Sequence, residues 1–288
     1  MKTLAQTLRV KHYFKNIFVL LPLFFSFEFM HPVSLVRAGA AFLAFCCAAS
    51  AVYIFNDLHD RERDARHPVK KDRPIASGRV SVRAAVLLLA VMGLAATALS
   101  LALDWRCLLV TMGYAVLNIS YTLRLKAIPI VDVACIALGF ILRVMMGGAA
   151  IDVPLSHWLL LTITAISFYL GFGKRANEKK RMGEDCQTRE VLSRYSDAFL
   201  RQVMTVMMAL TVILYALWTI DPSVTARFGT NLVYTTILVI LLILRYAYIL
   251  DGQDSHGDPV TVLLGDKPLL FGGAAYVAVL LLLAFTDL

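Results

Sequence analysis

The sequence predicts an all-α polytopic membrane protein with nine transmembrane helices. Hydrophobic residues make up 59% of the chain and the mean hydropathy is +0.71, whereas apolar residues make up about 45–50% of an ordinary soluble domain. Helices are expected throughout, because lipid offers no hydrogen-bonding partner to backbone N–H and C=O groups. No linker or low-complexity tract divides the chain, so residues 1–288 are expected to form one membrane domain.

Nine apolar runs account for the predicted helices, and most approach the ~20 residues that cross a bilayer. The first and fourth runs are short, so we expect them to tilt or to be shielded by neighbouring helices. In chain order the runs are Phe14–Phe27, Leu35–Phe55, Ala84–Leu103, Cys107–Tyr121, Ile128–Ala150, Pro154–Gly173, Phe199–Ile220, Leu232–Leu250 and Pro268–Phe285.

The basic residues predict the orientation of the chain. The net charge is +8, and nearly all Lys and Arg residues lie in the N-terminal segment and in alternate loops, which indicates a positive-inside bias and not a nucleic-acid surface. The exceptions are Arg37, Arg106, Arg143 and Arg227. We therefore expect a multi-pass protein of a bacterial-type inner (plasma) membrane, with a cytoplasmic N-terminus and cytoplasmic active-site loops.

An acidic cluster follows the second apolar run. Asn56, Asp57, Asp60 and Asp64 recur at spacings that place all four on one side of a helix. An unpaired Asp at the centre of a membrane helix costs roughly 2.5–3.5 kcal/mol, so a cation is expected to compensate. Oxygen ligands suit Mg²⁺, which commonly reaches a protein through a few carboxylates and substrate phosphates. The alternative is a solvated loop in which the interleaved arginines pair with the acids.

Other polar residues lie in or beside apolar runs. Lys15 and Asn16 open the first run, where a basic residue is also an ordinary determinant of orientation. Asp132 and Arg143 lie inside the fifth run. Ionisable groups at such positions are expensive and mark either a functional site or a structural ion pair within the bundle.

A cationic sequence follows the sixth apolar run. Lys174 and Glu178 are four residues apart and would share a helix face, as in a simple surface ion pair. The alternative is a phosphate pocket built from Lys174 and Arg175, because Arg offers bidentate contacts to phosphate and Lys offers a point charge.

The acidic cluster, the basic segment from His67 to Gly78 and the early Lys15 and Asn16 resemble the UbiA superfamily of intramembrane prenyltransferases. The resemblance runs along the whole chain and implies a nine-helix bundle with a central cavity that opens to the cytoplasmic side and to lipid. It also implies a diphosphate held through Mg²⁺. The implied metal ligands are Asn56, Asp57, Asp60 and Asp64, and the expected catalytic residues are the three aspartates with Lys15 and Asn16.

One departure from the superfamily pattern narrows the resemblance. Aromatic prenyltransferases carry a second aspartate-rich motif where this chain has Lys174, Arg175 and Glu178. This form, with Arg245-Tyr246 and the polar loop from Asp251 to Asp266, resembles decaprenyl-phosphate phosphoribosyltransferases. Further substrate contacts are expected from Asn56, Lys70, Arg73, Tyr121, Lys126, Asp132, Arg143, Lys174, Arg175 and Glu178.

The closer resemblance implies Mg²⁺-dependent transfer of 5-phosphoribose from phosphoribosyl diphosphate to a polyprenyl (decaprenyl-like) phosphate. Pyrophosphate would be released, and the product would serve cell-envelope glycan precursor synthesis. Tyr121 and Lys126 are one residue further apart than the corresponding pair in prenyl-transferring members.

Two alternatives remain at this point. One is a prenyltransferase that uses a polyprenyl diphosphate donor and an aromatic or glycerol-phosphate acceptor. The other is a transporter or channel lined by Asp132 and Arg143. Transport needs access from both faces of the membrane, whereas the ionisable residues gather towards one, so the sequence favours an enzyme.

Overall fold

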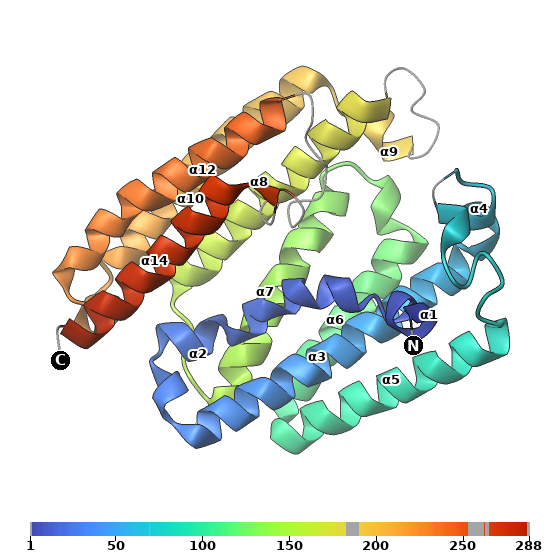
Figure 1. The fold of residues 1–288 in the computed structure, drawn as a ribbon, viewed down its shortest axis with the longest axis horizontal. Helices are drawn as coiled ribbons and strands as arrows, with labels where there is room; N and C mark the ends of the chain where they lie inside the picture. The colour runs from blue at the N-terminus through green and yellow to red at the C-terminus, as the bar shows by residue number, and fades with distance from the viewer. Residues whose placement is uncertain (1, 69, 183–189, 253–261, 263–264, 287–288) are drawn as a thin grey trace. The chain divides into compact units, whose positions relative to one another are not determined.

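All regular elements are helices in the part of the chain that the computed structural model describes (Figure 1), namely residues 2–68, 70–182, 190–252, 262 and 265–286. The internal contacts divide the chain into two units. The first comprises residues 1–126 and 138–155, and the second comprises residues 127–137 and 156–288. Helix α7 (Val131–Ile151) contributes its first residues to the second unit and the rest to the first.

The first unit is built on α3 (Pro32–His59), which packs against α5 (Val82–Leu103) and α6 (Trp105–Leu123). Asp104 separates α5 from α6, and its carboxylate caps α6 by accepting from the Arg106 N–H at 2.8 Å. The shorter elements are α1 (Lys2–Thr7), η1 (Val10–Leu20), α2 (Leu21–Phe25), η2 (Glu28–Met30), α4 (Arg61–Ala65), η3 (Lys70–Asp72) and η4 (Leu125–Ala127).

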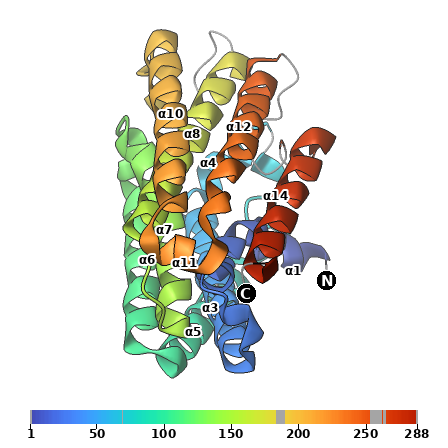
Figure 2. The same cartoon turned by 90° about the vertical axis from the view of Figure 1, so that its left-hand side faces the viewer.

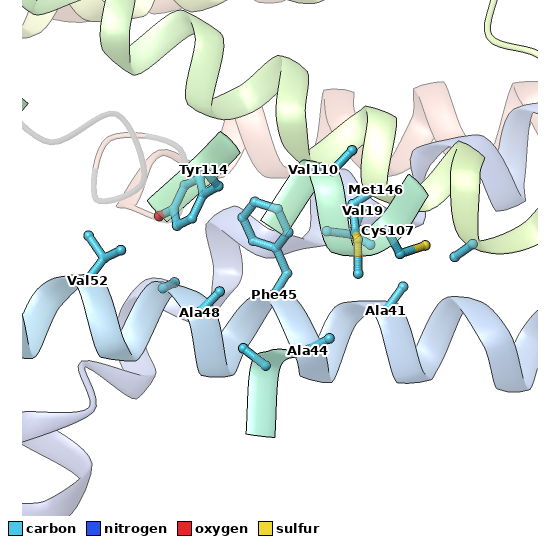
Figure 3. Close-up of a cluster of buried hydrophobic side chains, with 13 residues drawn as sticks. Val19, Ala41, Ala44, Phe45, Ala48, Val52, Cys107, Val110, Tyr114 and Met146 are labelled. Atoms are coloured by element: carbon cyan, nitrogen blue, oxygen red, sulfur yellow. The ribbon is translucent and has the colours of Figure 1, made fainter. Parts of the chain in front are cut away.

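A row of small residues lets other segments approach α3 closely. Ala41, Ala44 and Ala48 are buried along one side of the helix, and small residues allow helices to pack at short distance in a membrane. Phe45 rises from the same row toward Tyr114 of α6 (Figure 3), with ring centroids 4.6 Å apart. This aromatic pair fills the space above the alanines.

A glycine on α7 makes a second close approach in the first unit. A Cβ at Gly147 would lie 1.9 Å from the Val19 carbonyl oxygen of η1. No side chain fits at that separation, so glycine is required where α7 crosses η1.

The second unit contains the later helices, and α8, α10 and α12 run side by side in it (Figure 2). Ser196 caps α10 by accepting from the Phe199 N–H at 3.1 Å. The elements are α8 (His157–Met182), α9 (Glu190–Ser193), α10 (Asp197–Thr219), α11 (Pro222–Phe228), η6 (Thr230–Tyr234), α12 (Thr235–Asp251) and α14 (Lys267–Thr286).

The expected count of nine membrane helices is not met. Within the described residues, six helices are long and apolar enough to cross a bilayer: Pro32–His59, Val82–Leu103, Val131–Ile151, Asp197–Thr219, Thr230–Asp251 and Lys267–Phe285. These six make the chain a multi-pass membrane protein.

The other three runs are helical but fall short for different reasons. The first run is broken into η1 and α2, with Pro22 near the start of α2. Helix α6 is 19 residues long, but polar residues such as Asn118 interrupt its apolar sequence. Helix α8 ends in the charged sequence that begins at Lys174.

Candidate functional site

The acidic cluster lies where α3 passes into α4. Asp60 interrupts the helix, with φ −89° and ψ 8°, so the expected single helix through the cluster is divided into two. The hydrogen-bond ladder nevertheless continues across the break. The Asp60 N–H donates to the Asn56 carbonyl at 2.9 Å, and the Asp64 N–H donates to the Asp60 carbonyl at 2.8 Å. The acids therefore keep their helical spacing.

Asp57 and Asp64 are buried and share one arginine. Arg73 Nη1 lies 3.0 Å from Asp57 Oδ1 and 2.6 Å from Asp64 Oδ2. The Asp57 and Asp64 side chains are only 5% and 3% exposed, which strengthens these contacts because little water screens them. Lys70 Nζ lies 3.9 Å from Asp64 Oδ1. The predicted substrate residues Lys70 and Arg73 therefore meet the predicted metal ligands.

Asp60 and Asn56 face a different segment. Lys126 Nζ donates to both carboxylate oxygens of Asp60 at 3.0 Å. Thr122 Oγ1 donates to Asn56 Oδ1 at 3.2 Å. Tyr121, in the last turn of α6, is half-buried. Lys126 is thus brought to the acidic cluster despite its unusual distance from Tyr121 in the sequence.

Arg9 also belongs to this cluster, and the sequence reasoning missed it. Its Nη2 donates to Asp57 Oδ1 at 2.5 Å, and its guanidinium lies over the Tyr53 ring, 4.7 Å from the centroid. Arg9 has a left-handed backbone, with φ 53°, between α1 and η1. A basic residue before a first apolar run looks like an orientation signal, and no local spacing links it to Asp57.

His67 helps to shape the turn that carries Lys70. Its Nδ1 accepts a hydrogen bond from the Lys70 N–H at 3.3 Å. Burial lowers the pKa of His67 below its ordinary value of 6.5, and the Lys70 charge lowers that pKa further. The neutral imidazole is therefore the form that accepts the bond at pH 7.

The chemistry of the acidic cluster suits Mg²⁺, but its geometry here is that of a set of ion pairs. Carboxylate and amide oxygens are the ligands that Mg²⁺ prefers. Across the described part of the chain, no group of three or more His, Cys, Asp or Glu side chains is arranged to hold a metal. The carboxylates instead contact Arg9, Arg73, Lys70 and Lys126. A metal would enter this cluster only as these cations move from the carboxylates.

Arg143 lies in a polar and aromatic enclosure within the first unit. Its Nε donates to Asn16 Oδ1 at 2.9 Å, and its Nη1 donates to the Gly139 carbonyl at 2.7 Å. The guanidinium lies 5.0 Å from the centroid of Phe45 and 5.1 Å from that of Tyr114. Among the described residues no carboxylate pairs with it.

The predicted residues Lys15 and Asn16 lie on η1. Asn16 is 1% exposed and connects Arg143 to Cys46, because its Nδ2 donates to Cys46 Sγ at 3.2 Å. Lys15 is half-buried beside it. The structure therefore joins Asn16 with Arg143, which the sequence placed in separate groups.

Asp132 makes the structural ion pair that the sequence left open. Arg175 Nε lies 2.7 Å from Asp132 Oδ2, and both side chains are almost fully buried in the second unit. Tyr195 OH donates to Asp132 Oδ1 at 2.6 Å. Burial raises the pKa of Tyr195, and its bond to Asp132 raises that pKa further, so the phenol stays protonated as a donor. Tyr195 was another residue that the sequence reasoning missed.

Glu178 is shared by the two cations before it. Arg175 Nη1 donates to Glu178 Oε2 at 2.8 Å, and Lys174 Nζ lies 4.0 Å from Glu178 Oε1. Two carboxylates therefore surround Arg175. Lys174 is one-third exposed and is the more accessible of the two cations predicted to bind phosphate.

A bidentate ion pair joins α12 to the last residue of the polar loop that follows it. Arg245 Nε and Nη2 donate to the two oxygens of Asp266 at 3.3 Å and 2.8 Å. This pairing lowers the pKa of Asp266. Residues 253–261 and 263–264 of the loop, including Gly257 and Pro259, lie outside the described residues.

Solved structures share the fold. The structure of a UbiA homolog from Archaeoglobus fulgidus bound to GPP and Mg²⁺ superimposes with a TM-score of 0.75, at 20% identity, over 99% of this chain and 100% of that chain. A structure described for digeranylgeranylglyceryl phosphate synthase gives a TM-score of 0.69 at 18% identity, over 98% of each chain. At these identities the likeness concerns the fold alone.

Similar sequences carry a more specific name. A decaprenyl-phosphate phosphoribosyltransferase from Mycolicibacterium smegmatis is 31% identical over 284 residues, covering 92% of this chain and 87% of the relative. One from Corynebacterium glutamicum is 34% identical over 282 residues, covering 95% and 84%. The profile of the UbiA prenyltransferase family matches residues 17–264. The chain is therefore a membrane-bound transferase that belongs to the UbiA prenyltransferase family.

Proposed function

We propose that this protein transfers 5-phosphoribose from phosphoribosyl diphosphate to a polyprenyl phosphate and releases pyrophosphate. The observation that carries the proposal is a cluster of three acids and four cations. Arg73 spans Asp57 and Asp64. Arg9 pairs with Asp57, Lys70 with Asp64 and Lys126 with Asp60. The cations can bind the phosphate oxygens of a donor, and the carboxylates can hold a metal ion that binds its diphosphate. The names of the relatives in M. smegmatis and C. glutamicum support this reaction.

The cluster can exchange partners when a donor diphosphate arrives. Arg73 and Arg9 would move from carboxylate oxygens to phosphate oxygens, to which guanidinium groups form equally strong charged hydrogen bonds. The carboxylates of Asp57, Asp60 and Asp64, with the Asn56 amide, would then be free to hold Mg²⁺. When bound, Mg²⁺ would neutralise charge on the leaving pyrophosphate.

The reaction breaks the bond between ribose C1 and the diphosphate oxygen, and the electron pair leaves with pyrophosphate. A phosphate oxygen of the lipid forms the new bond to C1. No general base is required, because the lipid phosphate is already an anion at neutral pH. Arg9, Arg73 and Lys126 would hold the diphosphate and stabilise the charge that it gains.

The α8 segment supports a donor with a second, remote phosphate. Glu178 is the only acid within α8, and it contacts both Lys174 and Arg175; a single carboxylate beside two cations disfavours a second carboxylate clamp for Mg²⁺. Lys174 keeps one-third of its side chain exposed and is proposed to contact the 5-phosphate. A prenyl diphosphate has no corresponding group.

A donor assay on the purified protein in lipid tests the proposal. With polyprenyl phosphate present, phosphoribosyl diphosphate should release pyrophosphate and label the lipid. A polyprenyl diphosphate offered with an aromatic or glycerol-phosphate acceptor should release none. Release from the prenyl donor alone would contradict the proposal and establish the prenyltransferase alternative.

A further inference from the structure

A cavity in the second unit is separate from the residues assigned above. It has a volume of about 540 Å³ and lies where α8 and α12 end and α10 begins. Leu200, Met204 and Leu250 form its apolar lining. Because α10 and α12 are among the membrane-crossing helices, their ends lie at the level of the lipid headgroups. The cavity therefore combines an apolar interior with a position at the membrane surface.

Three of the charged groups at this cavity, Lys179, Lys180 and Asp197, already have partners. Lys179 Nζ lies 2.8 Å from Asp197 Oδ1. Lys180 Nζ donates to the Asp251 carbonyl at 2.7 Å and to the Gly252 carbonyl at 3.4 Å, where it compensates the negative end of the α12 dipole. These contacts maintain the walls of the cavity.

Arg201 and Asp251 differ from the other charged groups. Both line the cavity and both side chains are exposed. Within the described residues, neither side chain forms a hydrogen bond or an ion pair; the Arg201 charge acts at longer range on Asp197, one turn earlier on α10, which itself pairs with Lys179. The cavity therefore presents one cationic and one anionic group, held apart on α10 and α12.

We propose that this cavity binds the zwitterionic phosphoethanolamine headgroup of a bilayer lipid. The lipid phosphate would accept from Arg201, and the primary ammonium would donate to the Asp251 carboxylate. The apolar lining would contact the glycerol and the first methylene groups. Basic pockets between membrane helices commonly bind lipid headgroups, and the carboxylates at this cavity favour a headgroup that also carries a positive charge.

Lipid retention by the full chain tests the proposal. Delipidated protein in detergent is supplied with phosphatidylethanolamine, phosphatidylcholine or phosphatidylglycerol of matched acyl chains, and bound lipid is counted by native mass spectrometry. The unmodified protein should retain phosphatidylethanolamine about tenfold better than the other two. The quaternary ammonium of phosphatidylcholine has no N–H to donate, and phosphatidylglycerol has no cation for Asp251.

Three variants separate this site from general charge effects. Arg201→Gln and Asp251→Asn should each reduce retention of phosphatidylethanolamine to the level of phosphatidylcholine. Arg83→Gln removes an exposed charge from α5, in the first unit, and should leave retention unchanged.

Melting in lipid-free detergent reports whether each variant folds. If Arg201→Gln does not fold, Arg201→Lys replaces it, and its retention of phosphatidylethanolamine should be intermediate. Equal retention of all three lipids, preference for phosphatidylglycerol, or an equal loss in Arg83→Gln would overturn the proposal.

Discussion

Arg175 and Asp132 form an ion pair of 2.7 Å between helices α8 and α7, with side chains that are 1% and 0% exposed. Tyr195 and Glu178 supply further bonds, so each member of the pair has a second partner. A buried charge left without its partner is strongly destabilising, whereas the loss of both partners costs much less.

Removing one member of this pair should therefore destabilise the fold more than removing both. We expect Asp132→Leu and Arg175→Met each to lower the free energy of unfolding by about 3–5 kcal/mol, and the double variant to recover much of that loss. Unfolding in mixed micelles measures the effect. Additive losses in the double variant would show that the two side chains are not energetically coupled.

Asp60 is expected to be needed for catalysis more than for folding. Its side chain is 20% exposed and pairs with Lys126, unlike the buried Asp57. Asp60→Asn should lower turnover by about 10²-fold or more, the typical loss when one stabilising group is removed from the transition state, and EDTA should produce a matching loss in the unmodified enzyme. Asp72→Asn, at an exposed site in η3, is the control. Full activity of Asp60→Asn in EDTA would refute the metal assignment.

Lys174 should discriminate donors by their remote phosphate. A hydrogen bond to a charged group is worth about 1.5–3 kcal/mol, or roughly 10- to 150-fold in binding. We expect Lys174→Ala to reduce kcat/KM for phosphoribosyl diphosphate within that range and to reduce kcat/KM for a donor analogue without the 5-phosphate far less. Equal losses for both donors would mean that Lys174 does not contact this phosphate.

His67 should make the stability of the fold sensitive to mild acid. Its pKa is lowered in the folded chain, so the unfolded chain binds more protons as the pH falls through the ordinary value of 6.5. The stabilisation from neutral His67 is complete above that value and is lost as the pH falls toward the folded pKa.

His67→Gln keeps an acceptor that does not titrate. This variant should flatten the dependence of melting temperature on pH below about 6.5. A variant whose profile is identical to that of the unmodified protein would show that another group titrates in this window.

The orientation is tested by cysteine labelling in a background without the five native cysteines. The distribution of basic residues predicts that Lys71→Cys reacts with an impermeant reagent only after the cytoplasmic side is opened. Ser223→Cys, at an exposed position in α11, should react in intact cells. The reverse pattern would invert the predicted topology.

Local spacing predicted the acidic cluster because Asp57, Asp60 and Asp64 are neighbours in the sequence. It could not predict that Arg9, 48 positions from Asp57, donates to it, or that Tyr195 reaches Asp132 across 63 positions. Such contacts depend on tertiary packing.

The count of membrane helices was less predictable for a related reason. Hydropathy measures composition, but it does not register the change from η1 to α2 at Leu21, where Pro22 follows. Helix α6 and the charged end of α8 also have a lower apolar content than an isolated membrane helix. Both can tolerate polar residues because neighbouring segments can shield those residues.

The contact between Gly147 and Val19 has an evolutionary consequence. A methyl group at position 147 would overlap the Val19 carbonyl and crowd Pro22, so backbone position, and not side-chain chemistry, sets the constraint. Homologues that carry alanine at the position of Gly147 should therefore also show insertions, deletions or altered proline placement in the segment matching η1 and α2. The two regions would then vary together because of a steric constraint, which a comparison of each sequence position by itself does not capture.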